Sequence, residues 1–245
     1  MNNAVVKNAL SYSLGEDLHN NWCNQELYSF FLRFQQNYNK SKNPGQALGE
    51  ACYIDGKKRN EVEVDTDYIV NHPTQADELL KSFEVFKNLF TAGIIEVKRF
   101  TKRTLTEDEI KKSGDNYIDG MENILRPFNQ ISSQSKYDNL EAARVAIEMV
   151  FDKTMAGEQI SHEESEEMAS TIHDEWLKRN DWVFDPNYGD PKLAVPFAQL
   201  SQEEQDKDRA QLGPAQAKVQ AYMAGKIDVK AICEQYGLST SSRTR

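Results

Sequence analysis

Cysteine is scarce in this chain of 245 residues, which contains only 3. Cys23, Cys52 and Cys233 lie far apart, and none of them belongs to a C-x-x-C pair. This spacing argues against a disulfide framework and against a cysteine zinc site, because both need closely spaced or evenly paired cysteines. We therefore expect the protein to work in a reducing compartment, the cytoplasm.

Long apolar runs are lacking too. No stretch approaches the roughly 18 residues that a membrane helix needs, and the N-terminus has neither the basic start nor the apolar core of a secretory signal. Aromatic residues, in contrast, are plentiful, and 11 Phe, 10 Tyr and 3 Trp are too many for a wholly disordered chain. We expect a folded protein without a membrane partner.

Positive charge is outnumbered, since 29 Lys and Arg face 39 Asp and Glu, a formal net charge of -10. Non-specific binding to nucleic acid depends on neutralising phosphates, so this balance argues against a nucleic-acid partner. Residues 154–177 contain no Lys or Arg and are rich in Glu. A solvated helix face explains that stretch better than an acidic docking surface does.

Familiar catalytic motifs are also missing. The sequence contains no G-x-S-x-G, no P-loop and no H-E-x-x-H. The 4 histidines, His19, His72, His162 and His173, are too scattered to form a metal site within one stretch of sequence. We expect a non-enzymatic protein with no cofactor, no metal site and no catalytic residues. The one alternative that the sequence does not exclude is a catalytic site assembled from residues far apart in the chain.

The N-terminal part, residues 1–130, is predicted to be an α+β domain. Apolar residues recur with helical spacing over residues 3–20 and 24–38. A further helix is predicted from Thr74, as its cap, to Phe90, and Gly93 closes it.

Strand signals lie on both sides of that helix. Asp55-Gly56 is typical of a tight turn, and Val62 and Val64 alternate with acidic residues, which favours a β-hairpin. Residues 94–100 have strand composition, so we expect them to pair with the hairpin.

The C-terminal part is predicted to be mainly α, so that the chain is predominantly helical overall. The polar, serine-rich residues 129–136 separate the two parts, and helices are expected near residues 137–155 and 161–178. We predict three divisions: residues 1–130, 137–212 and 213–245. Capping boxes, in which a hydroxyl residue precedes a Glu by three positions, predict three helix starts. They are Thr106 with Glu109, Ser161 with Glu164, and Ser201 with Glu204.

Four motifs follow one another between Glu167 and Leu212. They are I-H-x-x-W at Ile172–Trp176, W-V-F at Trp182–Phe184, P-K-L-A-V-P-F-A-Q-L at Pro191–Leu200, and an acidic helix with Asp208-Arg209. In this order they resemble the Ry repeat, a module of ryanodine receptors that also occurs as a stand-alone domain in bacterial and phage proteins. The resemblance covers about residues 140–212 and leaves the N-terminal half unassigned.

The resemblance implies a binding or assembly module. It points to sensing or sequestering a nucleotide-type small molecule in a bacterial or phage setting, or to protein–protein assembly without a small ligand. Because Ry repeats occur in pairs, it also implies self-association as a homodimer or binding to another protein. The ligand-binding candidates are His173, Trp176, Arg179, Trp182, Phe184 and Tyr188.

Structural roles compete with these assignments. His173 can tie its helix to the proline-rich loop, and Trp176 and Trp182 can belong to a core. Arg179 lies where a helix ends, so it can compensate the helix dipole. Arg209 is expected to pair with Asp206 or Glu203 rather than to bind phosphate.

Residues 213–245 are predicted to form a helix, a turn at Gly225-Lys226 and a second short helix closed by Gly237. This is the outline of a helix-turn-helix, so a DNA-binding regulator is one alternative. Lys226 and Lys230 are offset by Asp228 and Glu234, however, and a C-terminal arm that packs on the Ry-like part or on a second subunit is the favoured interpretation.

Overall fold

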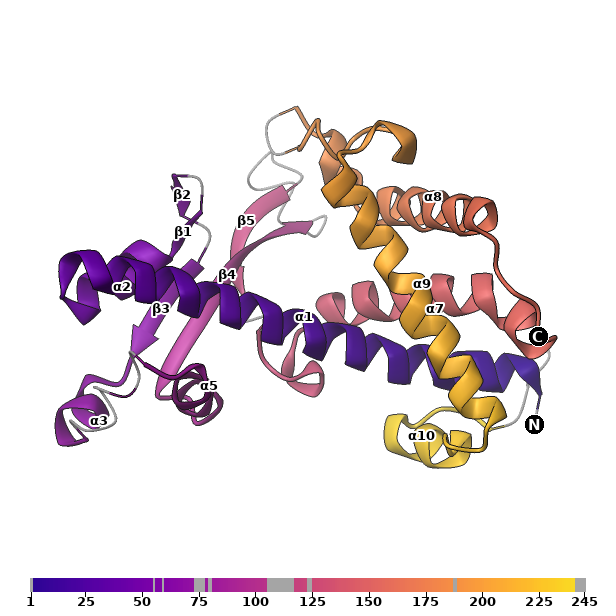
Figure 1. The fold of residues 1–245 in the computed structure, drawn as a ribbon, viewed down its shortest axis with the longest axis horizontal. Helices are drawn as coiled ribbons and strands as arrows, with labels where there is room; N and C mark the ends of the chain where they lie inside the picture. The colour runs from indigo at the N-terminus through magenta and orange to yellow at the C-terminus, as the bar shows by residue number, and fades with distance from the viewer. Residues whose placement is uncertain are drawn as a thin grey trace. The chain divides into compact units, whose positions relative to one another are not determined.

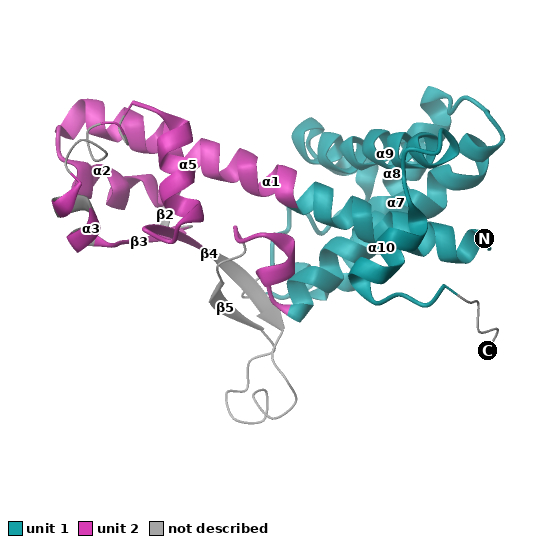
Figure 2. Cartoon of the chain, turned by 90° about the horizontal axis from the view of Figure 1, so that it is seen from below, with its two compact units in different colours: residues 1–19, 133–245 teal, residues 20–132 magenta. Residues whose placement is uncertain are grey.

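The computed structural model of the chain describes residues 2–54, 56–58, 60–72, 78, 81–104, 117–122, 125–186 and 189–240. Helices predominate, as predicted (Figure 1). The chain forms two compact units: unit 1 combines residues 1–19 with 133–245, and unit 2 comprises residues 20–132 (Figure 2). Within the described residues, no helix has both the length and the apolar composition of a membrane span.

The first helix, α1, runs without interruption from Asn3 to Ser41. The prediction of two helices with a gap between residues 20 and 24 was wrong, because the amide of Asn24 donates to the Asn20 carbonyl and the polar turn stays helical. Residues 3–19 of α1 belong to unit 1 and the remainder belongs to unit 2. The apolar side chains of α1 therefore pack into the core of unit 1 in its first part and into the core of unit 2 in its second part.

Unit 2 contains the strands that the sequence predicted. β1 and β2 form a short antiparallel hairpin across Gly56, whose φ of 74° explains the glycine at that turn. β3 pairs antiparallel with β4, with Val62 opposite Val97, and β5 pairs with the far part of β4. The predicted pairing of the hairpin region with residues 94–100 is confirmed. The strands are β1 (Tyr53–Ile54), β2 (Lys57–Lys58), β3 (Asn60–Val64), β4 (Ile95–Thr104) and β5 (Tyr117–Glu122).

Helices α2 (Pro44–Ala51), α3 (Thr66–Asn71) and α5 (Phe83–Thr91) complete the labelled helices of this unit. The start of α5 differs from the prediction, because the Ser82 side chain accepts from the Val85 N–H and caps the helix there. Thr74, the predicted cap, lies outside the described residues. Gly93 does close the helix, with φ of 74°.

Four phenylalanines dominate the core of unit 2. Phe30, Phe31 and Phe34 of α1 pack against Phe86 of α5, with ring centroids between 5.5 and 6.3 Å apart. Ile95 and Val97 of β4 belong to the same buried cluster. α1 and α5 are thereby joined to the sheet through apolar side chains.

Unit 1 is a helical assembly in which α9 packs against both α7 and α8. Its core holds Phe151 and Ile147 of α7 together with Leu10 and Leu14 of α1, all fully buried. Its elements are α7 (Ser133–Met155), α8 (His162–Arg179), the 3-10 helices η2 (Asp181–Phe184) and η3 (Phe197–Gln199), α9 (Gln202–Met223) and α10 (Val229–Tyr236).

The predicted helix caps in this unit are largely confirmed. Ser161 and Glu164 form the reciprocal capping box at the start of α8. The Ser201 hydroxyl accepts from the Glu204 N–H at the start of α9. The third predicted pair, at 106 and 109, lies outside the described residues.

Three features of unit 1 correct the sequence-based description. The predicted division between residues 212 and 213 falls inside α9, which continues through Pro214. Residues 1–19 join unit 1 rather than the N-terminal domain, because their apolar side chains complete its core. Trp182 and Phe184, whose alternation is typical of an extended segment, instead lie in the 3-10 turn η2 (Asp181–Phe184).

The C-terminal helix pair has the predicted outline. Gly225 and Gly237, with φ of 67° and 65°, end α9 and α10 in left-handed turns. Val229 and Cys233 of α10 are buried in the core of unit 1, and the Tyr236 hydroxyl donates to Glu16 of α1. The pair thus packs on its own unit as an arm.

Candidate functional site

A pocket of about 240 Å³ lies inside unit 1, within the segment that carries the four sequence motifs. Helix α8 forms one wall, the proline-rich loop at residues 191–200 forms a second, and α9 forms the third. The lining residues are His173, Trp176, Leu193, Leu200, Glu204, Lys207, Asp208 and Gln211. Two of the six predicted ligand residues, His173 and Trp176, are among them.

His173 joins two of these walls. Its side chain is only 4% exposed, and its Nε2 lies 2.8 Å from the Val195 carbonyl oxygen. A carbonyl can only accept, so Nε2 carries the hydrogen and the lone pair of the neutral ring is on Nδ1. The predicted tie between this helix and the proline-rich loop is confirmed.

Asp208 faces the other ring nitrogen of His173. Its Oδ2 lies 3.4 Å from Nδ1, and its side chain is 13% exposed. Burial raises the pKa of the Asp208 carboxyl to about 6, while the nearby His173 acts in the opposite direction. Asp208 is therefore a buried titratable carboxyl at the edge of the pocket, in contact with His173.

Helix α9 presents one polar face to the pocket. Glu204, Lys207, Asp208 and Gln211 recur at the three- and four-residue spacing that aligns side chains on a helix. The Gln211 amide oxygen is buried and has no hydrogen-bond partner among the described residues. A buried acceptor without a partner costs about 1–3 kcal/mol, so a ligand N–H at this position would be favourable.

Arg209 of α9 connects this helix to α8 next to the pocket. Its guanidinium donates two hydrogen bonds to Glu166 of α8, at 2.6 and 2.7 Å, and one to Asp206 at 2.8 Å. The same group lies 5.3 Å from the centre of the Phe197 ring. The predicted pair with Asp206 forms, although it is exposed rather than buried, and the bond to Glu166 fixes α8 against α9.

The two tryptophans form an edge-to-face pair with ring centroids 6.3 Å apart. Trp176 is half-buried: its ring lies nearly parallel to that of His173, with centroids 6.0 Å apart, and it lines the pocket. Trp182 donates its indole N–H to Asn180 at 3.1 Å and supports Trp176 from outside the pocket lining. A fully buried core position for Trp176 is therefore not what the structure has.

The remaining candidates lie elsewhere. The guanidinium of Arg179 has a buried, unpartnered Nε; burial lowers its pKa, and the carboxylate of Glu141 on α7 acts against that shift. Phe184 is 58% exposed and does not line the pocket. Tyr188 lies outside the described residues.

Comparison with models of protein families, with curated proteins and with solved structures finds no match for this chain. Within the described part of the chain, no three His, Cys, Asp or Glu side chains gather in a group that could hold a metal ion.

Gln211 and Lys207 were missed as pocket residues by sequence reasoning. Their signal is the spacing along α9, where positions 204, 207, 208 and 211 form one polar stripe beside the motif pair Asp208-Arg209. Such a stripe usually faces solvent. Here Leu193 and Leu200 of the proline-rich loop pack against α8, so that the loop and α8 form the other walls of the pocket beside the stripe.

Proposed function

We propose that this protein is a non-enzymatic, cytoplasmic ligand-binding protein built on a Ry-like module, in a bacterial or phage setting. Its ligand is a nucleotide-type small molecule, and the pocket between α8 and α9 binds the base. The observation that carries the proposal is that Gln211 and Asp208 both line an aromatic-walled pocket, and that the buried amide oxygen of Gln211 has no partner among the described residues. The free thiols of the three cysteines fit a reducing compartment.

The size of the pocket decides which part of a ligand enters it. Pockets for whole drug-sized ligands measure about 300–1,000 Å³, and this one measures about 240 Å³. A planar ring fits this volume, with the Trp176 indole along one side and Leu193 and Leu200 along the others. The sugar and phosphate of a nucleotide would remain outside.

The polar groups favour a base with an amino group. Gln211 offers an acceptor, and Asp208 offers a carboxylate above the pKa of about 6 at which it titrates. Side-chain amides and carboxylates are the groups that accept from the exocyclic amines of adenine and cytosine. Uracil and thymine have a carbonyl in place of this amino group, so the same position offers Gln211 no hydrogen-bond donor.

Electrostatics at the pocket mouth disfavour phosphate contact. Lys207 is bound to Glu204, with 2.6 Å between Nζ and Oε1, and its charge is already compensated. Asp208 adds a further acidic group. We therefore expect a nucleoside to bind at least as tightly as its phosphorylated forms.

A thermal-shift screen tests the proposal. Adenosine, cytidine, uridine, AMP and ATP would be compared on the wild type at a concentration about a hundredfold above Kd, where binding stabilises by about 2.7 kcal/mol. Each kcal/mol raises the melting temperature by about 2–4 °C in a chain of this size, so the expected rise is roughly 5–10 °C. Amino-bearing nucleosides should give it and uridine should not.

Gln211→Met removes the acceptor at similar volume and should weaken adenosine binding by about tenfold or more. Gln220→Met, on an exposed site of the same helix, is the matched control and should bind like the wild type. Equal shifts with uridine and adenosine would contradict the assignment of Gln211. The absence of any shift above about 1 °C would remove the nucleotide proposal.

Assembly is the second candidate, and the exposure of Phe184 favours it. Phe184 is 58% exposed and offers an aromatic surface that another protein could cover. Light scattering should then give about twice the chain mass at micromolar concentration, as for a two-fold dimer. A Phe184→Ser variant should return to the monomer mass, and a wild type that scatters as a monomer contradicts self-association.

A further inference from the structure

Unit 2 contains a second, larger cavity that the proposed function does not use. It is a cleft of about 650 Å³, within the range of pockets that hold a whole small molecule. Its walls come from α1, from the end of α5, from β4 and from the segment that leads into the 3-10 helix η1 (Phe128–Gln130). All of these residues belong to unit 2.

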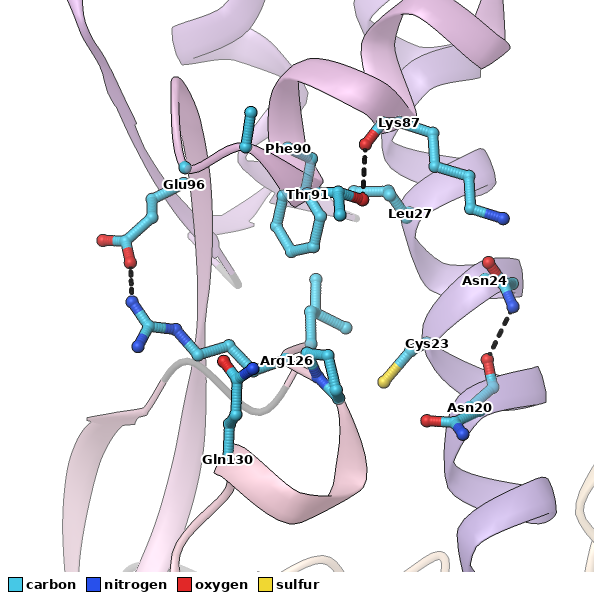
Figure 3. Close-up of a pocket in the computed structure, with 14 residues that line it drawn as sticks. Asn20, Cys23, Asn24, Leu27, Lys87, Phe90, Thr91, Glu96, Arg126 and Gln130 are labelled. Atoms are coloured by element: carbon cyan, nitrogen blue, oxygen red, sulfur yellow. Dashed lines mark hydrogen bonds and ion pairs between the residues drawn. The ribbon is translucent and has the colours of Figure 1, made fainter.

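One face of α1 forms the cleft's longest wall. Asn20, Cys23, Asn24 and Leu27 follow one another at helical spacing and all line the cavity. Leu27 is 3% exposed and Leu125 is 4% exposed, so the inner part of the cleft is apolar. The ring of Phe90 projects into the cleft (Figure 3).

The polar groups lie at the rim. In Figure 3 the amine of Lys87 lies on the same side of the cleft as the side chains of Asn24 and Asn20. The amide nitrogen of Asn24 donates to the Asn20 carbonyl, and the Asn24 amide oxygen has no partner among the described residues. Donors and acceptors at this side are thus available to a ligand.

Lys87 is unusual among the lysines of this acidic chain. The half-buried Lys7, Lys98, Lys153 and Lys218 each pair with a carboxylate. Lys87 is also half-buried, yet its ammonium makes no ion pair with any described residue. A cation that no described carboxylate compensates, at the rim of a partly apolar cavity in a protein with a net charge of -10, favours an anionic ligand.

The other charged groups limit the ligand to a single negative charge. Arg126, on the opposite side of the cleft, pairs with Glu96, so this pair contributes no net charge (Figure 3). The carbonyl end of α5, at Thr91 and Ala92, carries the negative pole of the helix dipole. The second negative charge of a phosphate dianion would be repelled by that pole. A carboxylate has a single negative charge, which Lys87 compensates.

Cys23 does not turn the cleft into a catalytic site. Burial, followed by the nearby carboxylate of Glu26, raises the pKa of its thiol to about 12, so the sulfur is protonated at neutral pH. A protonated thiol is a weak nucleophile and behaves as part of the apolar wall.

We propose that the cleft of unit 2 binds a small amphiphilic carboxylate, with the apolar body against Leu27, Phe90 and Leu125 and the carboxylate on Lys87. The site is separate from the pocket in unit 1 and does not rest on the proposed function. Its ligand class is a monoanion with an aromatic or alkyl body.

Isothermal titration calorimetry at fixed pH tests the site. Phenylacetate and octanoate would be compared with their neutral amides, at about 1 mM and above. The carboxylates should bind with a Kd roughly tenfold lower than that of the amides, because only a carboxylate can form an ion pair with the Lys87 ammonium.

Lys87→Gln should abolish the preference for carboxylates, and Lys87→Arg should retain it. Lys81→Gln, an exposed lysine of the same unit, is the matched control and should behave like the wild type. Unchanged melting temperatures would show that each variant is folded. Equal affinity for acids and amides, a preference that persists in Lys87→Gln, or no binding of any probe would each overturn the proposal.

Discussion

The buried contact between Asp208 and His173 predicts an unusual dependence of stability on pH. Asp208 has a folded-state pKa of about 6, raised by burial, whereas an unfolded Asp titrates near 3.9. Between these values the folded state holds the proton and the unfolded state does not. The free energy of unfolding must therefore fall as pH rises, because the native state binds more protons.

The magnitude follows from the difference between the two pKa values. About two units at 1.36 kcal/mol each give an upper value of about 3 kcal/mol. This contribution is fully present below about pH 4 and is lost as pH rises through about 6. Besides His173, the charged groups that act on Asp208 are Glu204, which raises its pKa, and Lys207 and Arg209, which lower it.

Asp208→Asn removes the titration and keeps a donor toward His173. The variant should match the wild type near pH 4 and exceed it by up to about 3 kcal/mol near pH 7.5. Urea unfolding would be followed by tryptophan fluorescence in a Trp22→Phe background, so that only the two tryptophans of unit 1 report. Other titrating groups contribute equally to the stability of both proteins, so their contributions cancel in the difference between the two free energies of unfolding.

The control is Asp174→Asn, which changes an exposed aspartate on α8 and should show no such trend. A difference between Asp208→Asn and the wild type that stays constant within about 0.5 kcal/mol from pH 4 to 7.5 would refute the burial of the carboxyl. A difference of opposite sign would mean that the ion pair with His173 dominates, and it would refute the direction of the shift.

Two glycines predict opposite responses to the same substitution, measured by thermal unfolding. Gly189→Ala should lower stability by at least about 1 kcal/mol, because the added carbon would lie 2.3 and 2.4 Å from the carbonyl oxygens of Asp185 and Val183. Gly49→Ala should raise stability by about 0.5–1 kcal/mol, because the site lies inside α2 and no atom beyond its neighbours and its own helix backbone comes within 4 Å of the added carbon.

Local signals in the sequence predicted local structure well. Ser161 with Glu164 begins α8, Gly93 closes α5 and Gly237 closes α10, because caps and left-handed turns depend on a few neighbouring residues. The continuity of α1 escaped prediction, since its apolar face serves Leu10 and Leu14 in one unit and Phe30 in the other. In the sequence alone, a change in which side of a helix is buried looks like a break between two helices, because the elements that pack on each side are unknown.

The site was predicted only where a motif marked it. His173 and Trp176 were found through the spacing of I-H-x-x-W, and the tie from His173 to the proline-rich loop was anticipated. Asp208 appeared only as part of a motif match, and the role of Gln211 was missed. The burial of both depends on contacts between α8 and α9, which are far apart in sequence.

The division of α1 between two units has a consequence for the order in which the chain folds. The ribosome releases Leu10 and Leu14 more than a hundred residues before their partners on α7 and α9. Residues 20–132 can form their own core in that interval, because their contacts are complete once β5 and the segment after it have emerged. Residues 3–19 must therefore wait as a helix with an uncovered apolar face, and unit 1 closes after unit 2.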